Sequence, residues 1–294
     1  MKNIIKYITV LTGFLGVFLM SSCDELPEEQ FVKYVLFARN GFVEHQFEYR
    51  SDTLLRKDIS VSVSGTSVLN KDLDFTIAVD PDTLKDYNYA RYLEDSSLYL
   101  QTLPDSCYSF ESLSGTVKAG DEYGLIPVNI IGSKVNKFHN YVLPLRIVSA
   151  SEYTIAPVYS VLMLEVQFVN NYSGTYVFTS SVSGIQRNGN LEFKVVDENT
   201  CFFISNYTGD VYNTYPPILV TFNSDNSLTI SGRDEDELNI VESDTTLAGE
   251  TTNYFEEDEK ALTRTLTLTF SYYDPVSEST KLFDGVMVMA LEEE

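Results

Sequence analysis

Residues 263–270 read TRTLTLTF, a strict alternation of polar and apolar side chains. Successive side chains of a β-strand point to opposite faces, so this period of two predicts a strand with one solvated and one buried face. Similar runs, rich in β-branched and aromatic residues, recur along the chain and predict an all-β protein. They lie at 59–63, 75–79, 128–130, 143–147, 161–169, 175–181, 191–196, 201–204, 218–222, 227–231 and 283–290.

Two β domains are predicted, divided at the turn-rich NNYSG of residues 170–174. Residues 35–169 are expected to form an immunoglobulin-like β-sandwich, and residues 170–294 an antiparallel β-meander, either barrel-like or a sandwich. One short helix is predicted from Asp80, a candidate N-cap followed by Pro81, and is expected to cover one edge of the sandwich. The acidic stretch 234–260 is expected to be a mobile loop outside the core.

The N-terminus has the pattern of an export signal. Lys2 and Lys6 precede an apolar run at 8–20 that is shorter than the ~20 residues of a membrane span. The run ends in LMSSC, which resembles a bacterial lipobox, so residues 1–22 are predicted to be a signal peptide and Cys23 the lipidated residue. An ordinary signal peptide with a chance cysteine is the alternative.

Residues 23–34 are predicted to be a lipid-anchored acidic linker. Its DELPEE at 24–29 resembles the signal that sends Bacteroidota lipoproteins to the outer face of the outer membrane. A merely solvated acidic linker is the alternative reading. The expected location is therefore the outer membrane, lipid-anchored and facing the extracellular side.

The net charge argues against two classes of partner, and the positions of the cysteines argue against a disulfide. The net charge is -23 with a pI near 4.3, which argues against nucleic acid and against an anionic membrane surface as partners, because both need basic protein surface. Beyond Cys23 the only cysteines are Cys107 and Cys201, one in each half of the chain. They are expected to be buried small hydrophobes rather than a disulfide.

No catalytic or metal-binding motif stands out. The only histidines, His45 and His139, are expected to be structural, and no Gly-x-Ser-x-Gly elbow is present. Zinc sites need clustered Cys and His, and no stretch matches a calcium loop. With 43 acidic residues, a pair of carboxylates can always be imagined and indicates nothing. We therefore predict no catalytic residue, no cofactor and no metal.

One turn-rich segment is a candidate sugar site. Sugars in β domains are commonly held by an aromatic ring with amide and carboxylate groups nearby, and tyrosine must supply the ring because the chain has no Trp. The candidate glycan-binding residues are Tyr207, Tyr212, Tyr215, Asn206, Asp210 and Asn213. The alternative is that these tyrosines pack on a sheet edge. Tyr87, Tyr89 and Tyr92 form a second cluster, which we interpret as packing.

Several phrases of the sequence resemble known modules. They are DP at 80–81, DYN at 86–88, LP at 103–104, Tyr108, VKAG at 117–120 and YVLPLRIVSA at 141–150. They resemble the N-terminal module of many Bacteroidota surface lipoproteins, domain of unknown function 1735. From YSGTY at 172–176 to FDG at 283–285, the chain is similar to a module that often follows it, domain of unknown function 4361.

This resemblance implies a role in polysaccharide utilisation. The first module also precedes the catalytic domain of some family 18 glycoside hydrolases, but their Asp-x-x-Asp-x-Asp-x-Glu motif is absent from the sequence. We therefore expect a non-catalytic surface lipoprotein that binds or presents polysaccharide or oligosaccharide for a neighbouring transporter or glycosidase. The alternative is a structural or adhesion lipoprotein with a protein partner and no small-molecule site.

Overall fold

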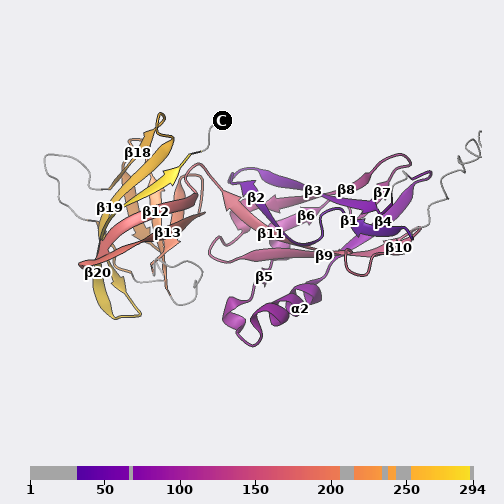
Figure 1. The fold of residues 1–294 in the computed structure, drawn as a ribbon, viewed down its shortest axis with the longest axis horizontal. Coiled ribbons are helices and arrows are strands. Elements are labelled where there is room, and N and C mark those ends of the chain that lie inside the picture. The colour runs from indigo at the N-terminus through magenta and orange to yellow at the C-terminus, as the bar shows by residue number, and fades with distance from the viewer. Residues whose placement is uncertain (1–31, 66–68, 206–214, 234–237, 243–252, 292–294) are drawn as a thin grey trace, which may run out of the picture.

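The computed structural model describes residues 32–65, 69–205, 215–233, 238–242 and 253–291. Cys23, the expected signal peptide and most of the expected linker lie outside these residues. Within them, no helix is long and apolar enough to cross a membrane. Figure 1 shows two bodies of strands side by side along the longest axis.

The N-terminal body is a sandwich of two facing sheets. The first contains, in order, β10 (Thr154–Ile155), β1 (Tyr34–Phe37), β3 (Leu54–Val63), β8 (Tyr123–Ile131) and β6 (Tyr108–Phe110). The second contains β2 (Gly41–Glu48), β11 (Val161–Val169), β9 (Tyr141–Ala150), β4 (Leu73–Val79) and β7 (Ser114–Val117), with β5 (Gln101–Thr102) beside β9. Short 3-10 turns lie at Ser96–Leu98, Asp105–Cys107 and Gly132–Lys134. Inward-facing apolar side chains of both sheets, such as Ile126 and Leu145, form one core.

The predicted helix is present as α2 (Pro81–Tyr92), with Asp80 at its N-cap and Pro81 in the first turn. Leu84 is buried against Val142 and Met163, so the helix covers the outer face of β9 and β11. These strands lie inside the sheet order, and the expectation of a helix over the sandwich edge is therefore wrong. The cause is that β9 and β11 carry apolar side chains on both faces, and the outer ones need a cover.

The C-terminal body is one sheet that curls into a near-barrel. Its order is β16 (Leu228–Gly232), β15 (Pro217–Phe222), β14 (Thr200–Ile204), β13 (Ile185–Val195), β12 (Gly174–Val182), β20 (Ser279–Ala290), β19 (Thr263–Asp274) and β17 (Val241–Glu242), with β18 (Tyr254–Asp258) also on β19. Every strand pair described in this sheet is antiparallel. The amide of Leu228 donates to the Asn253 carbonyl at 2.9 Å and joins the two ends of the sheet. The predicted all-β class is confirmed.

The described part of the acidic stretch 234–260 is not the loop outside the core that we predicted. Residues 234–237 and 243–252 lie outside the part that the structure describes, and the described remainder includes strands β17 and β18. Leu238 is 2% exposed and packs in the barrel core. In β18, Phe255 points inward while Glu256 and Asp258 face solvent. An edge strand with one buried side chain has too little periodicity to be recognised in sequence.

Both cysteines are buried and free, as expected. The Cys107 thiol donates to the Lys134 carbonyl at 3.2 Å, and the Cys201 thiol to Asn170 Oδ1 at 3.3 Å. Burial raises the pKa of the Cys201 thiol to about 12, so this cysteine behaves as a small core residue.

Candidate functional site

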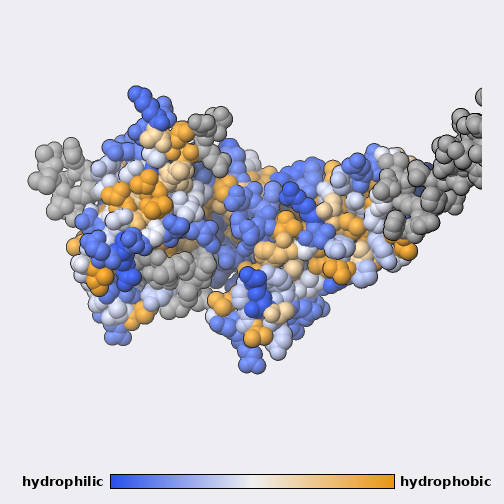
Figure 2. All heavy atoms as spheres, viewed as in Figure 1, coloured by the Kyte–Doolittle hydropathy of each residue, from blue (hydrophilic) through white to orange (hydrophobic). Residues whose placement is uncertain are grey.

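A cleft lies where the C-terminal barrel meets the N-terminal sandwich. It has a volume of about 570 Å³ and joins a second hollow of about 330 Å³. We call the joined space the junction cleft. Figure 2 shows the surface hollowed between the barrel and the helical lobe, residues 80–101. Both hollows are lined by His139, Asn140, Glu165, Gln167, Glu192 and Lys194.

Three tyrosines of the helical lobe form one side of the junction cleft. Tyr87 stacks on Phe42 of β2, with ring centroids 5.3 Å apart and ring planes 10° from parallel. The rings of Tyr92 and Tyr99 lie 6.4 Å apart. All three tyrosines are half-buried, so each ring is supported by protein and still lines the cleft. We call these three residues the aromatic wall.

A buried amide joins the two segments that carry the aromatic wall. Asn88 on α2 is 4% exposed. Its Nδ2 donates to the Leu100 carbonyl at 2.8 Å, and the Leu100 amide donates to its Oδ1 at 3.1 Å. The Tyr99 hydroxyl donates to the carbonyl of Leu93, just after the helix. The helix and the segment after it therefore present their tyrosines as one surface.

The start of α2 is fixed to the sandwich by a charged contact. The Arg146 guanidinium on β9 pairs with Asp80 and donates to the Thr83 hydroxyl at 2.6 Å. Thr83 in turn donates to Asp80 at 2.7 Å. Burial would raise the pKa of Asp80, but the hydrogen bonds from Arg146 and Thr83 outweigh it and lower that pKa. Together with the pairing of β5 with β9, this contact holds the helical lobe to the sandwich at both of its ends.

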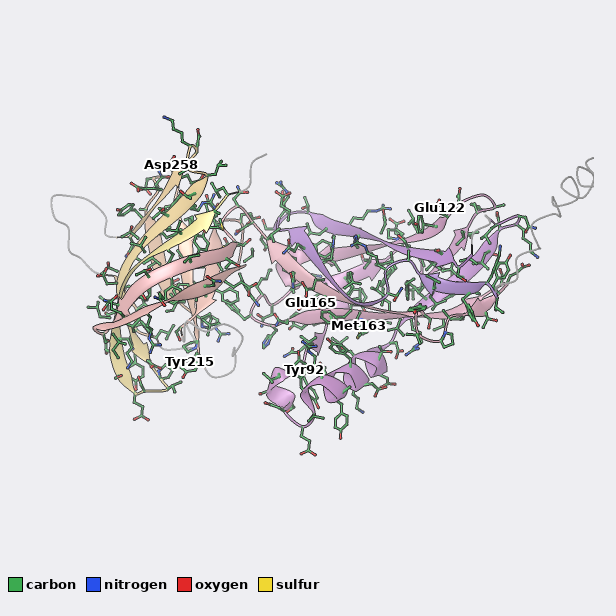
Figure 3. All side chains as sticks on the ribbon, viewed as in Figure 1. Tyr92, Glu122, Met163, Glu165, Tyr215 and Asp258 are labelled. Carbon is green, nitrogen blue, oxygen red and sulfur yellow. The ribbon has the colours of Figure 1, made fainter. Side chains whose placement is uncertain are left out.

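Glu165 forms the floor of the junction cleft. It lies on β11, opposite Glu44 on β2, and is 8% exposed. Gln167 Nε2 donates to its carboxylate at 3.0 Å. Burial raises the pKa of the Glu165 carboxyl; the Gln167 hydrogen bond opposes this effect and the Glu44 charge adds to it. Figure 3 shows Glu165 on the sandwich, above Tyr92 of the helical lobe.

The remaining walls come from the barrel and from the segment before β9. On β13, Lys194 Nζ lies 3.7 Å from the Glu192 carboxylate, and both side chains line the cleft. His139 precedes β9, and its Nδ1 lies 3.3 Å from Gln101 Nε2. The cleft therefore combines side chains of both bodies.

Direct contacts hold the two bodies together beside the cleft. Phe138 of the sandwich packs on Phe202 of the barrel, with ring centroids 4.9 Å apart, and the Arg233 guanidinium lies 4.8 Å from the Phe138 ring centre. The amide of Ser51 donates to Glu198 at 2.6 Å. These contacts join the sandwich to the barrel next to the junction cleft.

The chemistry of the cleft is suited to binding. It offers aromatic rings, amides and carboxylates within one concave surface, a combination that can hold a ligand with apolar faces and many hydroxyl groups. Among the described residues, no three His, Cys, Asp or Glu side chains come together as metal ligands.

Comparisons with known proteins agree with this architecture. A family model for an N-terminal domain matches residues 31–154, and one for a C-terminal domain matches residues 160–288. A protein of unknown function from Bacteroides ovatus is 22% identical, with a TM-score of 0.70 over 87% of this chain and 94% of its own. A Bacteroides ovatus multidomain protein that includes domain of unknown function 1735 is also 22% identical, with a TM-score of 0.69 over 87% of this chain and 94% of its own.

The chain has the two-domain fold of these Bacteroides proteins. An auxiliary nutrient binding protein from Bacteroides thetaiotaomicron shares this fold at 21% identity, with a TM-score of 0.63 over 85% of this chain and 90% of its own. No curated protein matches the sequence. The sequence resemblance to the 1735 module thus agrees with a structural neighbour that contains it.

One strand of the sandwich falls within the C-terminal family match. The C-terminal family model begins at residue 160, yet β11 (Val161–Val169) pairs with β2 and β9 of the sandwich. This strand leads directly from the cleft floor into the barrel. Glu165 therefore lies on the strand that leads to the domain junction.

Only one of the predicted glycan-binding residues is among the described residues. Tyr207, Tyr212, Asn206, Asp210 and Asn213 lie outside the described residues. Tyr215 is half-buried and lies on the barrel (Figure 3), and it is absent from the lining of both hollows. That site stays a prediction.

The sequence interpretation missed the aromatic wall. Tyr87 does pack on Phe42, as interpreted, but Tyr87 and Tyr92 also line the cleft. Tyr89 points away and is 59% exposed. A signal was available in β11, where Glu165 and Gln167 interrupt an apolar run. A carboxylate in a doubly covered strand needs a polar space beside it.

Proposed function

We propose that this protein is a non-catalytic lipoprotein of the outer-membrane surface that binds extracellular glycan in the junction cleft. The aromatic wall of Tyr87, Tyr92 and Tyr99 is the observation that carries the proposal. A pyranose ring has an apolar CH face that stacks on an aromatic ring and a rim of hydroxyls that needs hydrogen-bond partners.

The polar residues of the cleft can supply hydrogen-bond partners for the hydroxyls of a pyranose ring. Gln101, Asn140 and Gln167 supply amides, and Glu165 and Glu192 supply carboxylates, on the sides of the cleft that adjoin the wall. Amides both donate and accept, and carboxylates accept strongly, so together they suit hydroxyl groups that do both. The nutrient-binding description of one structural neighbour supports a binding role.

Affinity gels containing different polysaccharides test the proposal. The mature protein is expected to be retarded by at least one neutral polysaccharide among mannan, laminarin, starch, galactan and xylan. Retardation by none of them, together with copurification of other surface proteins, would contradict glycan binding and favour the structural or adhesion role.

The membrane anchor has a separate test at Cys23. The Cys23→Ala variant cannot accept a diacylglycerol chain, and stable anchoring depends on such chains. We expect wild-type protein in the outer-membrane fraction, accessible to protease on intact cells, and the variant in the soluble fraction. A variant that stays in the membrane fraction would contradict lipidation at Cys23, without bearing on the cleft.

A further inference from the structure

We propose that the junction cleft selects uncharged glycans and excludes those that carry uronic acid or sulfate groups. The inference rests on the proposed function and specifies its ligand class. It follows from the charges of three elements that meet at the cleft.

Three carboxylates converge on the cleft from three strands. Glu44 lies on β2, Glu165 on β11 and Glu192 on β13. Glu44 and Glu165 are neighbours across adjacent strands. The charges of Glu44 and Glu192 both raise the pKa of Glu165, and the charge of Lys194 lowers it. Sandwich and barrel thus contribute negative charge to one space.

Two of the three Lys and Arg residues of the described lining are already engaged. Lys194 lies 3.7 Å from Glu192. Lys137 donates to the Gly132 carbonyl and lies 4.6 Å from the Tyr49 ring centre, and burial lowers its pKa.

The third cation, Arg91, is exposed at the end of α2, 5.7 Å from the Tyr92 ring centre. It lies at the edge of the helical lobe, whereas Glu165 lies on the floor. Beyond Arg91, an anionic sugar in the cleft would meet Glu44, Glu165 and Glu192, whereas Lys137 and Lys194 are already engaged. Like charges in a partly desolvated space repel more strongly than they do in water.

The net charge of -23 adds a weaker, general repulsion. Repulsion between exposed charges is screened beyond ~8 Å at physiological salt. The local effect of the cleft must therefore be separated from the effect of net charge.

The experiment uses a matched pair of probes. Dissociation constants are measured at low salt for the neutral polysaccharide that is retained best and for its carboxymethylated derivative, which has the same backbone. Polygalacturonate and chondroitin sulfate serve as natural anionic probes. The wild-type protein is expected to bind each anionic probe at least about tenfold more weakly than the neutral one.

Two triple variants assign the effect to the cleft. Glu44→Gln, Glu165→Gln and Glu192→Gln together remove the carboxylates of the cleft. Glu122→Gln, Glu256→Gln and Glu259→Gln remove the same charge at exposed positions outside its lining. The cleft triple should reduce the ratio of anionic to neutral dissociation constants by about tenfold, and the control triple should leave it within about twofold. Thermal melting verifies that both variants fold.

Three outcomes would overturn the inference. An anionic probe that binds as tightly as the neutral one, with binding lost on removal of Tyr92 and Tyr99, refutes the ligand class and leaves the proposed function standing. An equal change of the ratio in both triples assigns the selectivity to net charge instead of the cleft. Binding of no probe refutes the proposed function and this inference with it.

Discussion

The double variant Tyr92→Ala, Tyr99→Ala is expected to lose about 100-fold in affinity for a retained polysaccharide. Both rings line the cleft, with their centroids 6.4 Å apart. Truncating a ring that stacks on a ligand costs about 1–2 kcal/mol, and each 1.4 kcal/mol is about tenfold in affinity. Affinity electrophoresis and calorimetry measure the loss.

Tyr89→Ala is the matched control. Tyr89 lies on the same helix but is 59% exposed and does not line the cleft. Its removal is expected to change affinity by less than about twofold, since it supplies no ring to the ligand. A double variant that folds normally and is retarded as strongly as the wild type would show that the aromatic wall does not bind glycan.

Replacing Arg264 by Ala is expected to lower the free energy of unfolding of the barrel by about 3 kcal/mol. The Arg264 side chain is 6% exposed and pairs with Glu257. It also donates to the Asn171 carbonyl and lies 4.9 Å from the Tyr172 ring centre. One guanidinium therefore joins β18 and β19 to the segment that connects the two bodies. Its loss leaves the Glu257 carboxylate and the Asn171 carbonyl without this hydrogen-bond donor.

Urea unfolding measures this effect, with Arg56→Ala as the control. Arg56 pairs with Asp58 on the surface, and its side chain is 58% exposed. Exposed pairs contribute little, so this variant should stay within about 0.5 kcal/mol of the wild type. Equal unfolding midpoints for the two variants would mean that Arg264 does not stabilise the junction.

The sequence predicted the fold where a strand has two different faces. TRTLTLTF became the first part of β19, because Leu266, Leu268 and Phe270 face the barrel core while the threonines face outward. The sequence also predicted the helix start at Asp80 and Pro81, because Pro suits the first turn of a helix. The Asp80 side chain makes no capping hydrogen bond to the helix backbone and instead accepts from Arg146 and Thr83. Local patterns fail for a short strand such as β18, in which only one side chain is buried.

The candidate site depends on distant segments, and the sequence could not predict it. Tyr92 and Glu192 lie 100 positions apart along the chain, and only the packing of barrel on sandwich brings their elements to one cleft. Sequence patterns show only residues that are close along the chain, and they therefore predicted the site at Tyr207, Tyr212 and Tyr215. Of all the cleft residues, Glu165 carried the clearest local signal, because it breaks an apolar strand.

Hydrogen–deuterium exchange with and without a bound neutral polysaccharide tests most directly whether glycan occupies the junction cleft. Binding there is expected to slow exchange on both sides, in peptides that contain 87–101 of the helical lobe and in peptides that contain 190–195 of β13. Protection confined to peptides around 206–216, with both cleft segments unchanged, would contradict the account.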